Sequence, residues 1–595
     1  MDARWWCACL VVVSVTACAT REPAPPSGQQ QQVPSPAPPL AGNGETAATL
    51  TDKKAEQTPI AARVAAPTPL ATPPAAAMVA PAPLGPPGVA IERLESLSIV
   101  GGVSGRILAP DQDWRTSRSF NTEAYAHTDE NPLRRVTTDP LSTFSIDVDT
   151  ASYANVRRFL NSGTLPPSGA VRIEELINYF RFTYPQPTAG RPFSVTTELA
   201  VCPWNRTHLL ALVGLQGRAL PTRELPARNL VFLIDVSGSM QTPDKLPLVR
   251  QALRLLADSL SARDRVAIVV YAGNTGLVLP STPGGDKARI SAALAGLEAG
   301  GSTNGGQGIQ LAYRIAREQF VRGGVNRVIL ATDGDFNVGV TSHDELVQLI
   351  EHERTSGVFL SVLGVGTGNL KDSTMEMLAD KGNGNYSYLD SLHEARKVLI
   401  EEAGGTMVTI AKDVKIQVEF NPRAVNGYRL IGYENRILQA QDFNDDRKDA
   451  GDIGAGHSVT ALYEIVPAGV ALEGAGVDPL KYQTPPAPVR GSGADELMTV
   501  KLRYKAPDRD DSQLISTVVA NRPSPATSNL GFASAVAEVG MLLRGTTQAP
   551  GVSYEAAIAR ARQFRPSDDD GYRAEFIRLA ELAAGLHRLP QTARE

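Results

Sequence analysis

The chain has 595 residues, more than one hydrophobic core usually serves, so we expect several folded units. Many of its 43 prolines lie near the amino terminus, and the formal net charge is only −5. No cluster of Lys and Arg is present to neutralise phosphates, which excludes nucleic acid as a predicted partner.

The amino terminus has the features of an export signal. Arg4 precedes an apolar run from Leu10 to Val15, far shorter than the roughly 20 residues of a membrane-spanning helix. The tetrapeptide V-T-A-C (Val15–Cys18) resembles the processing site of bacterial lipoproteins. We therefore predict a signal peptide over 1–17 and a lipid anchor on Cys18, with an ordinary signal peptide as the alternative. Because Ala19 resembles sequences sorted to the outer membrane, we expect the protein in the cell envelope at that membrane, facing the periplasm or the surface.

The cysteines exclude a disulfide scaffold. Cys7, Cys9 and Cys18 fall in the first eighteen residues, which leaves Cys202 alone in the rest of the chain. A single thiol cannot form an internal disulfide, so packing must hold the folded part together. Cys202 is predicted to be a small buried apolar residue and not a reactive thiol.

Residues 18–115 are rich in Pro, Ala, Gln and Thr and poor in aromatic residues. Such a segment cannot bury enough apolar surface to offset its ordering entropy. We predict a disordered tether, which would hold a folded head away from the membrane.

The next predicted segment spans 116–190. Regular structure is expected to begin between Phe120 and Leu141, with a strand at 143–148 and helices at 151–160 and 172–182. Asp147 and Asp149 could form a metal site. The favoured interpretation is that Asp149 and Thr150 cap the following helix.

A strand–helix alternation predicts a doubly wound α/β unit over 229–405. Its buried strands are short, uniformly apolar runs, which are typical of a parallel sheet covered on both faces. Between them lie amphipathic helices. The runs are 230–234, 266–270, 328–330 and 358–363, and the helices include 246–260 and 309–316.

Strands are predicted on both sides of this unit. Two lie in 191–228, at 193–201 and 208–215, and we expect them to pair with a β-rich domain at 406–525. The later strands are 414–420, 428–433, 458–465, 497–504 and 514–519, and helices follow at 533–543, 554–563 and 572–586 within a helical region, 526–595. The predicted fold class is therefore an α/β unit flanked by or inserted in a β-rich domain, with a helical carboxyl-terminal end.

The first apolar strand of the α/β unit ends in the pattern D-x-S-x-S, formed by Asp235, Ser237 and Ser239. Open α/β sheets place ligands at the carboxyl ends of their strands. A carboxylate and two hydroxyls on a tight turn at Gly238 are hard oxygen ligands suited to Mg²⁺.

Two further loops are expected at the same end of the sheet. The Gly-rich loop 300–304 carries Thr303, with Ser302 as a one-residue alternative. Another apolar strand ends in Thr332-Asp333-Gly334. One such loop would be weak evidence for a metal site. Three loops expected at the same end of the sheet are strong evidence for one.

These three loops, in this order, resemble the metal-ion-dependent adhesion site of the von Willebrand factor A family. The resemblance implies that Asp235, Ser237, Ser239, Thr303 and Asp333 hold the metal, the hydroxyls directly and the two aspartates partly through water. It extends to the segment 145–153 and to the chain beyond Lys412, which look like bacterial members with an associated amino-terminal region and an uncharacterised carboxyl-terminal domain.

A site with so few carboxylates leaves a cation incompletely neutralised, so that an acidic side chain of a partner can bind it. We predict a membrane-anchored module that binds a protein through an Asp or Glu carboxylate and Mg²⁺, with Mn²⁺ or Ca²⁺ as alternative ions.

The other hypotheses are an envelope scaffold with a purely structural metal and a metal-dependent enzyme. The sequence disfavours an enzyme, because it has no phosphate-binding G-x-x-x-x-G-K-[ST], no H-E-x-x-H and no evident nucleophile–base pair. The glycines of 362–368 are interpreted as a turn.

Overall fold

The computed structural model describes residues 122–188, 190–272, 275–301, 305–334, 343–402, 407–472, 493–565 and 567–589. The predicted signal peptide and tether lie outside these residues. The chain from Pro110 to Glu595 forms one compact unit. Among its described helices, none is long and apolar enough to cross a bilayer.

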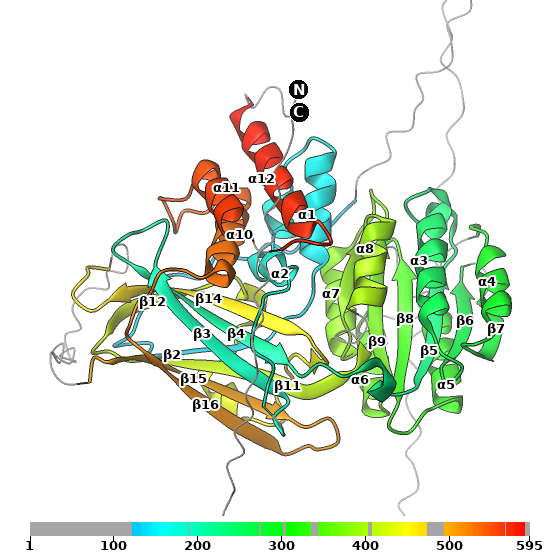
Figure 1. The fold of residues 1–595 in the computed structure, drawn as a ribbon. Coiled ribbons are helices and arrows are strands. Elements are labelled where there is room, and N and C mark those ends of the chain that lie inside the picture. Colours follow the sequence, from blue (N-terminus) through cyan, green and yellow to red (C-terminus); the bar gives the residue numbers. More distant parts are fainter. Residues whose placement is uncertain are drawn as a thin grey trace, which may run out of the picture. The chain divides into compact units, whose positions relative to one another are not determined.

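A six-stranded sheet of order β10-β9-β8-β5-β6-β7 forms the centre of the α/β unit (Figure 1). Its strands are β5 (Arg228–Asp235), β6 (Arg265–Tyr271), β7 (Gly276–Pro283), β8 (Val325–Thr332), β9 (Phe359–Val365) and β10 (Tyr386–Leu389). Neighbouring strands are parallel except β7, which runs antiparallel to β6 at the edge of the sheet. The sequence did not predict β7, because Leu277 and Val278 are exposed there and no apolar run marks it.

Helices cover both faces of this sheet. They are α3 (Leu246–Ser259), α4 (Lys287–Ala295), α5 (Gly305–Glu318), α6 (His343–Thr355), α7 (Asp372–Lys381) and α8 (Leu392–Arg396). Alternate residues of β5 contribute to two different cores. Phe232 and Ile234 share one with α3, whereas Val231 and Leu233 share the other with α5. Burial on both faces explains why the strand is uniformly apolar.

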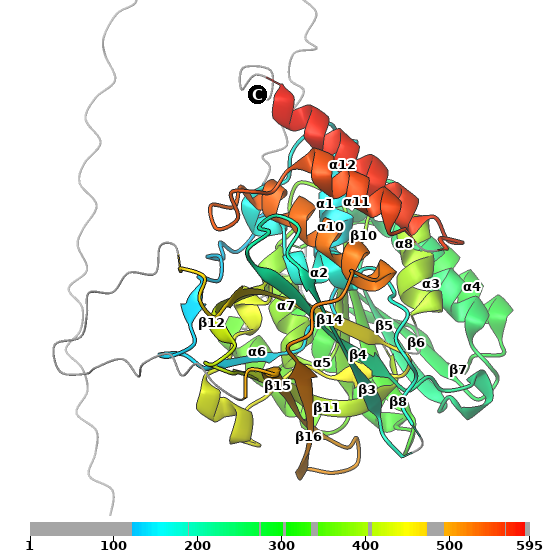
Figure 2. The same cartoon turned by 60° about the vertical axis from the view of Figure 1, so that its left-hand side comes forward.

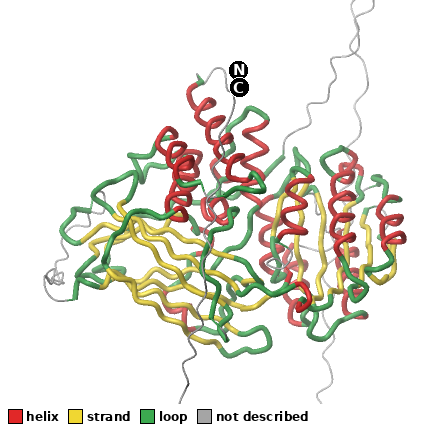
Figure 3. Tube along the Cα trace, in the orientation of Figure 1, coloured by secondary structure: helices red, strands yellow, loops and turns green. Residues whose placement is uncertain are grey.

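The remaining strands form two sheets that enclose a common core. One has the order β1-β12-β14-β4-β3, and the other has the order β13-β11-β15-β16, with β2 also paired to β11. The strands are β1 (Arg134–Arg135), β2 (Leu141–Ser145), β3 (Phe193–Val201), β4 (Leu209–Gly217), β11 (Thr409–Phe420), β12 (Val425–Ile431), β13 (Ile453–Gly454), β14 (Ser458–Pro467), β15 (Glu496–Lys505) and β16 (Ser512–Ala520). Val213 and Tyr463 of the first sheet pack with Val418 and Leu502 of the second. Figure 3 shows the strands of this β-sandwich gathered apart from those of the α/β unit.

The α/β unit is inserted into the β-sandwich. β4 precedes it in the chain and β14 follows it, yet the two strands pair, with Leu212 opposite Leu462. The chain therefore leaves the sandwich after β4 and returns to it at β11. The predicted fold class is confirmed.

A helical layer lies beside both parts. It consists of α1 (Ala151–Asn161), α2 (Ile173–Asn178), α10 (Ser528–Arg544), α11 (Tyr554–Gln563) and α12 (Tyr572–Arg588), and the last three lie side by side next to α1 (Figure 2). The rings of Phe180, Phe532 and Phe576 meet edge to face, with centroids 5.1 to 5.6 Å apart. Cys202 is fully buried in the same core and burial raises the pKa of its thiol, so the predicted apolar role is confirmed.

Candidate metal centre

Asp235 is the last residue of β5 and is fully buried. Its Oδ1 accepts a hydrogen bond of 2.8 Å from the backbone N–H of Ser237, which closes the turn. Its Oδ2 accepts from the hydroxyls of Tyr271 at 3.2 Å and Thr332 at 3.3 Å. The carboxylate is thus held in one orientation by the strands on either side of β5.

The two serines of the D-x-S-x-S pattern lie together. Their hydroxyl oxygens are 3.0 Å apart, and Ser237 is buried whereas Ser239 is exposed. A short 3-10 turn, Gly238–Gln241, places both on the same side of the loop. Two adjacent hydroxyl oxygens, one of them open to solvent, are suitable ligands for a hard cation.

Asp333 follows β8 directly, next to the end of β5, and is also fully buried. Its Oδ2 accepts a hydrogen bond of 2.8 Å from Nζ of Lys245, whereas its Oδ1 has no hydrogen-bond partner among the residues that the structure describes. A buried carboxylate oxygen without a partner is costly, because its hydration is lost and not replaced. This oxygen is the feature of the site that most directly indicates a missing ligand.

Lys245 is the residue that the sequence did not reveal. Its ammonium group bridges Asp333 and the side-chain oxygen of Asn369, and its stem lies against Gly366. A side chain at Gly366, whose φ is 75°, would collide with that stem. The glycines predicted to form a turn therefore also make room for the lysine.

The Gly-rich loop is anchored to the D-x-S-x-S loop by its backbone. The N–H of Gly300 donates to the carbonyl of Val236 at 2.7 Å, and the N–H of Gly238 donates to the carbonyl of Gly301 at 3.2 Å. Thr303 and Cys18 lie outside the described residues, so their predicted roles stay predictions.

Burial, together with the nearby Asp333 carboxylate, raises the pKa of Asp235 to about 6, although hydrogen bonds from Ser237 and Tyr271 oppose the shift. The structure thus brings Asp235, Ser237, Ser239 and Asp333 to one end of the sheet. Two carboxylates, one of them with the unpartnered oxygen of Asp333, and two hydroxyls are oxygen ligands that fit an octahedral ion such as Mg²⁺. Their assignment as metal ligands stays a prediction.

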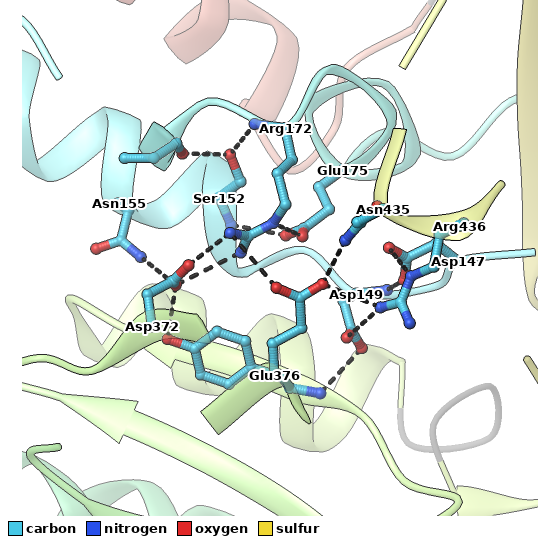
Figure 4. A network of polar contacts seen from close by, with 12 residues as sticks. Asp147, Asp149, Ser152, Asn155, Arg172, Glu175, Asp372, Glu376, Asn435 and Arg436 are labelled. Carbon is cyan, nitrogen blue, oxygen red and sulfur yellow. Dashed lines mark hydrogen bonds and ion pairs between the residues drawn. The ribbon is translucent and has the colours of Figure 1, made fainter. Parts of the chain in front are cut away.

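A second acid-rich cluster lies between the α/β unit, α2 and the β-sandwich (Figure 4). One carboxylate oxygen from each of Asp147, Glu175 and Glu376 lies within 4.8 Å of the other two. Asp147 and Glu175 are buried, and the side chain of Glu376 is 12% exposed. The geometry alone could hold a metal ion.

Guanidinium groups already neutralise these carboxylates. Arg172 pairs with Glu175 and Asp372, and Arg436 contacts Asp147 at 3.1 Å and Glu376 at 3.2 Å. Figure 4 shows Glu376 between Arg172 and Asn435. We therefore assign this cluster a structural role, as an ion-pair network that joins the units.

The predicted helix cap at Asp149 and Thr150 is wrong. Neither side chain bonds to the start of α1, because Oδ1 of Asp149 accepts from the N–H of Tyr386 instead. The cap comes from Glu175 on α2, whose Oε2 accepts from the N–H of Ser152 at 2.8 Å. The start of α1 is therefore capped by a carboxylate that is distant in sequence, and not by the adjacent residues that the local pattern predicted.

Three known family models match successive parts of the chain. The von Willebrand factor type A domain model matches residues 229–399, a model described as von Willebrand factor matches 119–212, and "Uncharacterized protein YfbK, C-terminal" matches 405–586. The chain is 45% identical over 477 residues to "Uncharacterized protein YfbK" of Escherichia coli K12, covering 79% of this chain and 82% of that one.

Proteins with lower sequence identity match a smaller part of the chain. The magnesium-chelatase 60 kDa subunit of Cereibacter sphaeroides is 28% identical over 209 residues, covering 32% of this chain and 37% of that protein. The solved structure titled von Willebrand factor type A from Catenulispora acidiphila has 14% identity and a TM-score of 0.38, and it covers 65% of this chain and 96% of that one.

We predict that Arg436→Met strongly destabilises the protein. The substitution leaves Asp147, Glu376 and Asp380 without their shared cation, and breaking a buried pair in this way costs about 3–5 kcal/mol. Urea unfolding followed by circular dichroism measures the loss. The control is Arg447→Met, because Arg447 is 90% exposed and pairs only with Asp445. Equal midpoints for the two variants would refute the role of the network.

We also predict that stability falls as the pH rises from about 5 to about 9. Burial, with Glu434 and Asp147 nearby, raises the pKa of Glu174 from 4.5 to about 8. The folded protein therefore keeps a proton that the unfolded chain releases above its lower pKa, so rising pH favours unfolding until the folded-state pKa is passed.

Glu174→Gln should flatten this dependence and raise the melting temperature at pH 9, by an effect of up to about 5 kcal/mol for a shift of this size, with little change at pH 5. Thermal melts across this pH range test it, with the exposed Glu318→Gln as control. A slope unchanged from wild type would contradict the assignment of the buried proton to Glu174.

Proposed function

The chain belongs to the YfbK family of von Willebrand factor type A proteins, and from this premise we propose that it binds a protein partner through a divalent cation held at the carboxyl end of its α/β sheet. Von Willebrand factor type A domains typically mediate protein interactions and often depend on a metal ion. The observation that carries the proposal is the unpartnered Oδ1 of the buried Asp333, beside the hydroxyl pair of Ser237 and Ser239.

Asp235, Ser237, Ser239, Thr303 and Asp333 would hold the ion, and Mg²⁺ is the proposed species because all these donors are hard oxygens. When bound, the cation supplies positive charge that an Asp or Glu side chain of a partner can approach. The exposed hydroxyl of Ser239 marks the side from which that approach is open.

Lys245 adjusts the charge of this site. Its ammonium group neutralises part of the charge on Asp333, so that Asp235, Asp333 and Lys245 together leave one net negative charge when all are ionised. A divalent cation more than balances that charge. The surplus would favour an anionic partner over a neutral one.

We propose binding without catalysis. The hydroxyl of Ser237 lies beside that of Ser239 and near the Asp235 carboxylate, and no histidine among the described residues forms a hydrogen bond with it that could activate it as a nucleophile. The similarity to the magnesium-chelatase subunit covers only a third of the chain and does not support a chelatase activity here. The alternative function is an envelope scaffold in which the ion only ties the loops together.

We further propose that Cys18 carries a lipid anchor and that the protein works in the cell envelope, at the outer membrane. The lipoprotein-like sequence Val15–Cys18 and the Pro-rich segment after it support this proposal. An anchored tether would let the metal centre reach partners at a distance from the membrane.

Asp235→Asn should weaken Mg²⁺ binding by about tenfold or more, because it removes a charge while keeping an acceptor for Tyr271 and Thr332. Calorimetric titration of the full chain with Mg²⁺ measures this, and crosslinking capture from intact cells with and without EDTA measures partner binding. Asp258→Ala, an exposed change on α3, is the control. The metal bridge is wrong if Asp235→Asn and EDTA leave both readouts unchanged.

Cys18→Ser should abolish incorporation of a labelled fatty acid and release the protein from membranes into the soluble fraction. Cys7→Ser provides the matched control, since it changes a cysteine before the processing site. Retention of label in the Cys18 variant would disprove the anchor.

A further inference from the structure

A polar cavity of about 550 Å³ lies between the α/β unit and the β-sandwich. Its α/β wall includes Arg327 of β8 and Arg354 at the end of α6. Its other wall includes Asp149 after β2 and Asp452 in the loop before β13. The volume is in the range of small-molecule sites, which is roughly 300–1,000 Å³.

Arg327 is a buried cation without a counter-ion. The residue is 2% exposed, its Nη1 donates to the hydroxyl of Ser361, and its guanidinium lies over the ring of Phe359. Its Nε has no hydrogen-bond partner in the described part of the chain. No carboxylate among the described residues forms an ion pair with it. Burial lowers the pKa of this guanidinium to about 10, which still leaves it charged at neutral pH.

Other buried arginines show that this situation is unusual in the protein. Arg157, Arg172 and Arg429 each have a carboxylate within 3.1 Å. Arg573 is the other buried arginine that forms no ion pair within the described ranges; it donates to the carbonyl of Arg181 and lies over the ring of Phe532. Arg327 is the one that lines a cavity of ligand size.

Asp452, on the other wall of the cavity, is an acidic residue with a similarly incomplete set of partners. Its Oδ1 accepts a hydrogen bond from the N–H of Asp413 at 3.2 Å, and its Oδ2 has no hydrogen-bond partner in the part of the chain that is described. Arg327 and Asp452 attract each other, but they do not come within the 4.0 Å of an ion pair. The cavity therefore presents a guanidinium on one wall and a carboxyl group on the other, neither with an ion-pair partner among the described residues. Burial raises the pKa of Asp452 to about 7, and an ammonium group bound beside it would favour its charged form.

We propose that this cavity binds a small zwitterion, an amino acid or a short peptide, with its carboxylate on Arg327 and its ammonium group on Asp452. A planar carboxylate matches the donor geometry of a guanidinium, and it would supply the missing counter-ion. The ammonium group would do the same for Asp452. This site is distinct from the metal centre and does not depend on it.

The melting temperature of an Arg327 variant, measured without ligand, distinguishes a binding role for this residue from a structural one. A buried cation that the chain itself does not pair costs stability, so Arg327→Gln should leave the melting temperature unchanged or raise it. Loss of a structural arginine would lower it. A large drop in melting temperature for Arg327→Gln would therefore overturn the proposal.

The binding test uses alanine, dialanine and trialanine, whose charge separations differ, with acetate and ethylammonium as single-charge probes. Calorimetric titration of the full chain should give saturable binding of one molecule for at least one of the three zwitterions, with the best length distinguishing amino acid from peptide. Arg327→Gln and Asp452→Asn should each weaken it by roughly tenfold or more.

Arg354→Gln is the matched control, because Arg354 lines the same cavity but is already paired with Asp449 and Asn383. The proposal fails if no zwitterion binds, if acetate binds as tightly as the best zwitterion, or if Arg354→Gln weakens binding as much as Arg327→Gln. Asp452→Asn tests the other wall independently, and unchanged affinity of this variant for the best zwitterion would also contradict the proposal.

Discussion

The guanidinium groups of Arg172 and Arg436 determine how the α/β unit sits against the rest of the protein. Arg172, just before α2, reaches Asp372 at the start of α7, and Arg436, after β12, reaches Asp380 near its end. Both ends of α7 are thus bound to charges from outside the α/β unit. Separating the units would leave buried carboxylates unpaired, so the network favours one arrangement of the two parts.

This arrangement gives the two ends of the sheet different chemistry. Asp333 directly follows β8, whereas Arg327 lies near its start, six residues earlier, which corresponds to roughly 20 Å along a strand. The carboxyl end carries the proposed metal centre, with the exposed hydroxyl of Ser239. The amino end faces the β-sandwich across the cavity, so any ligand there contacts both units.

Sequence patterns predicted the features that depend on near neighbours. Uniform apolar runs marked β5 and β8, and the spacing of Asp235, Ser237 and Ser239 marked the loop after β5. The pairing of the strands before and after the α/β unit was also predicted, but specific side-chain contacts between distant segments were not predictable. Lys245 meets Asp333 only because the sheet brings their loops together, and Glu175 caps α1 only because α2 packs beside it. Local sequence spacing can predict a helix cap, but it does not reveal whether a side chain from a distant segment will bind the same backbone N–H instead.

Buried charges in this protein fall into two classes, and the distinction bears on function. Where the chain supplies a partner, as for Arg172, the charge contributes to the arrangement of the units. Where the described residues leave an atom of a charged group without a partner, as for Oδ1 of Asp333 and Nε of Arg327, folding leaves a desolvation cost that an external group can remove. Such a group gains binding free energy from a site that is already desolvated and oriented. The two unpartnered groups at opposite ends of β8 are therefore the places where ligands have the most to contribute.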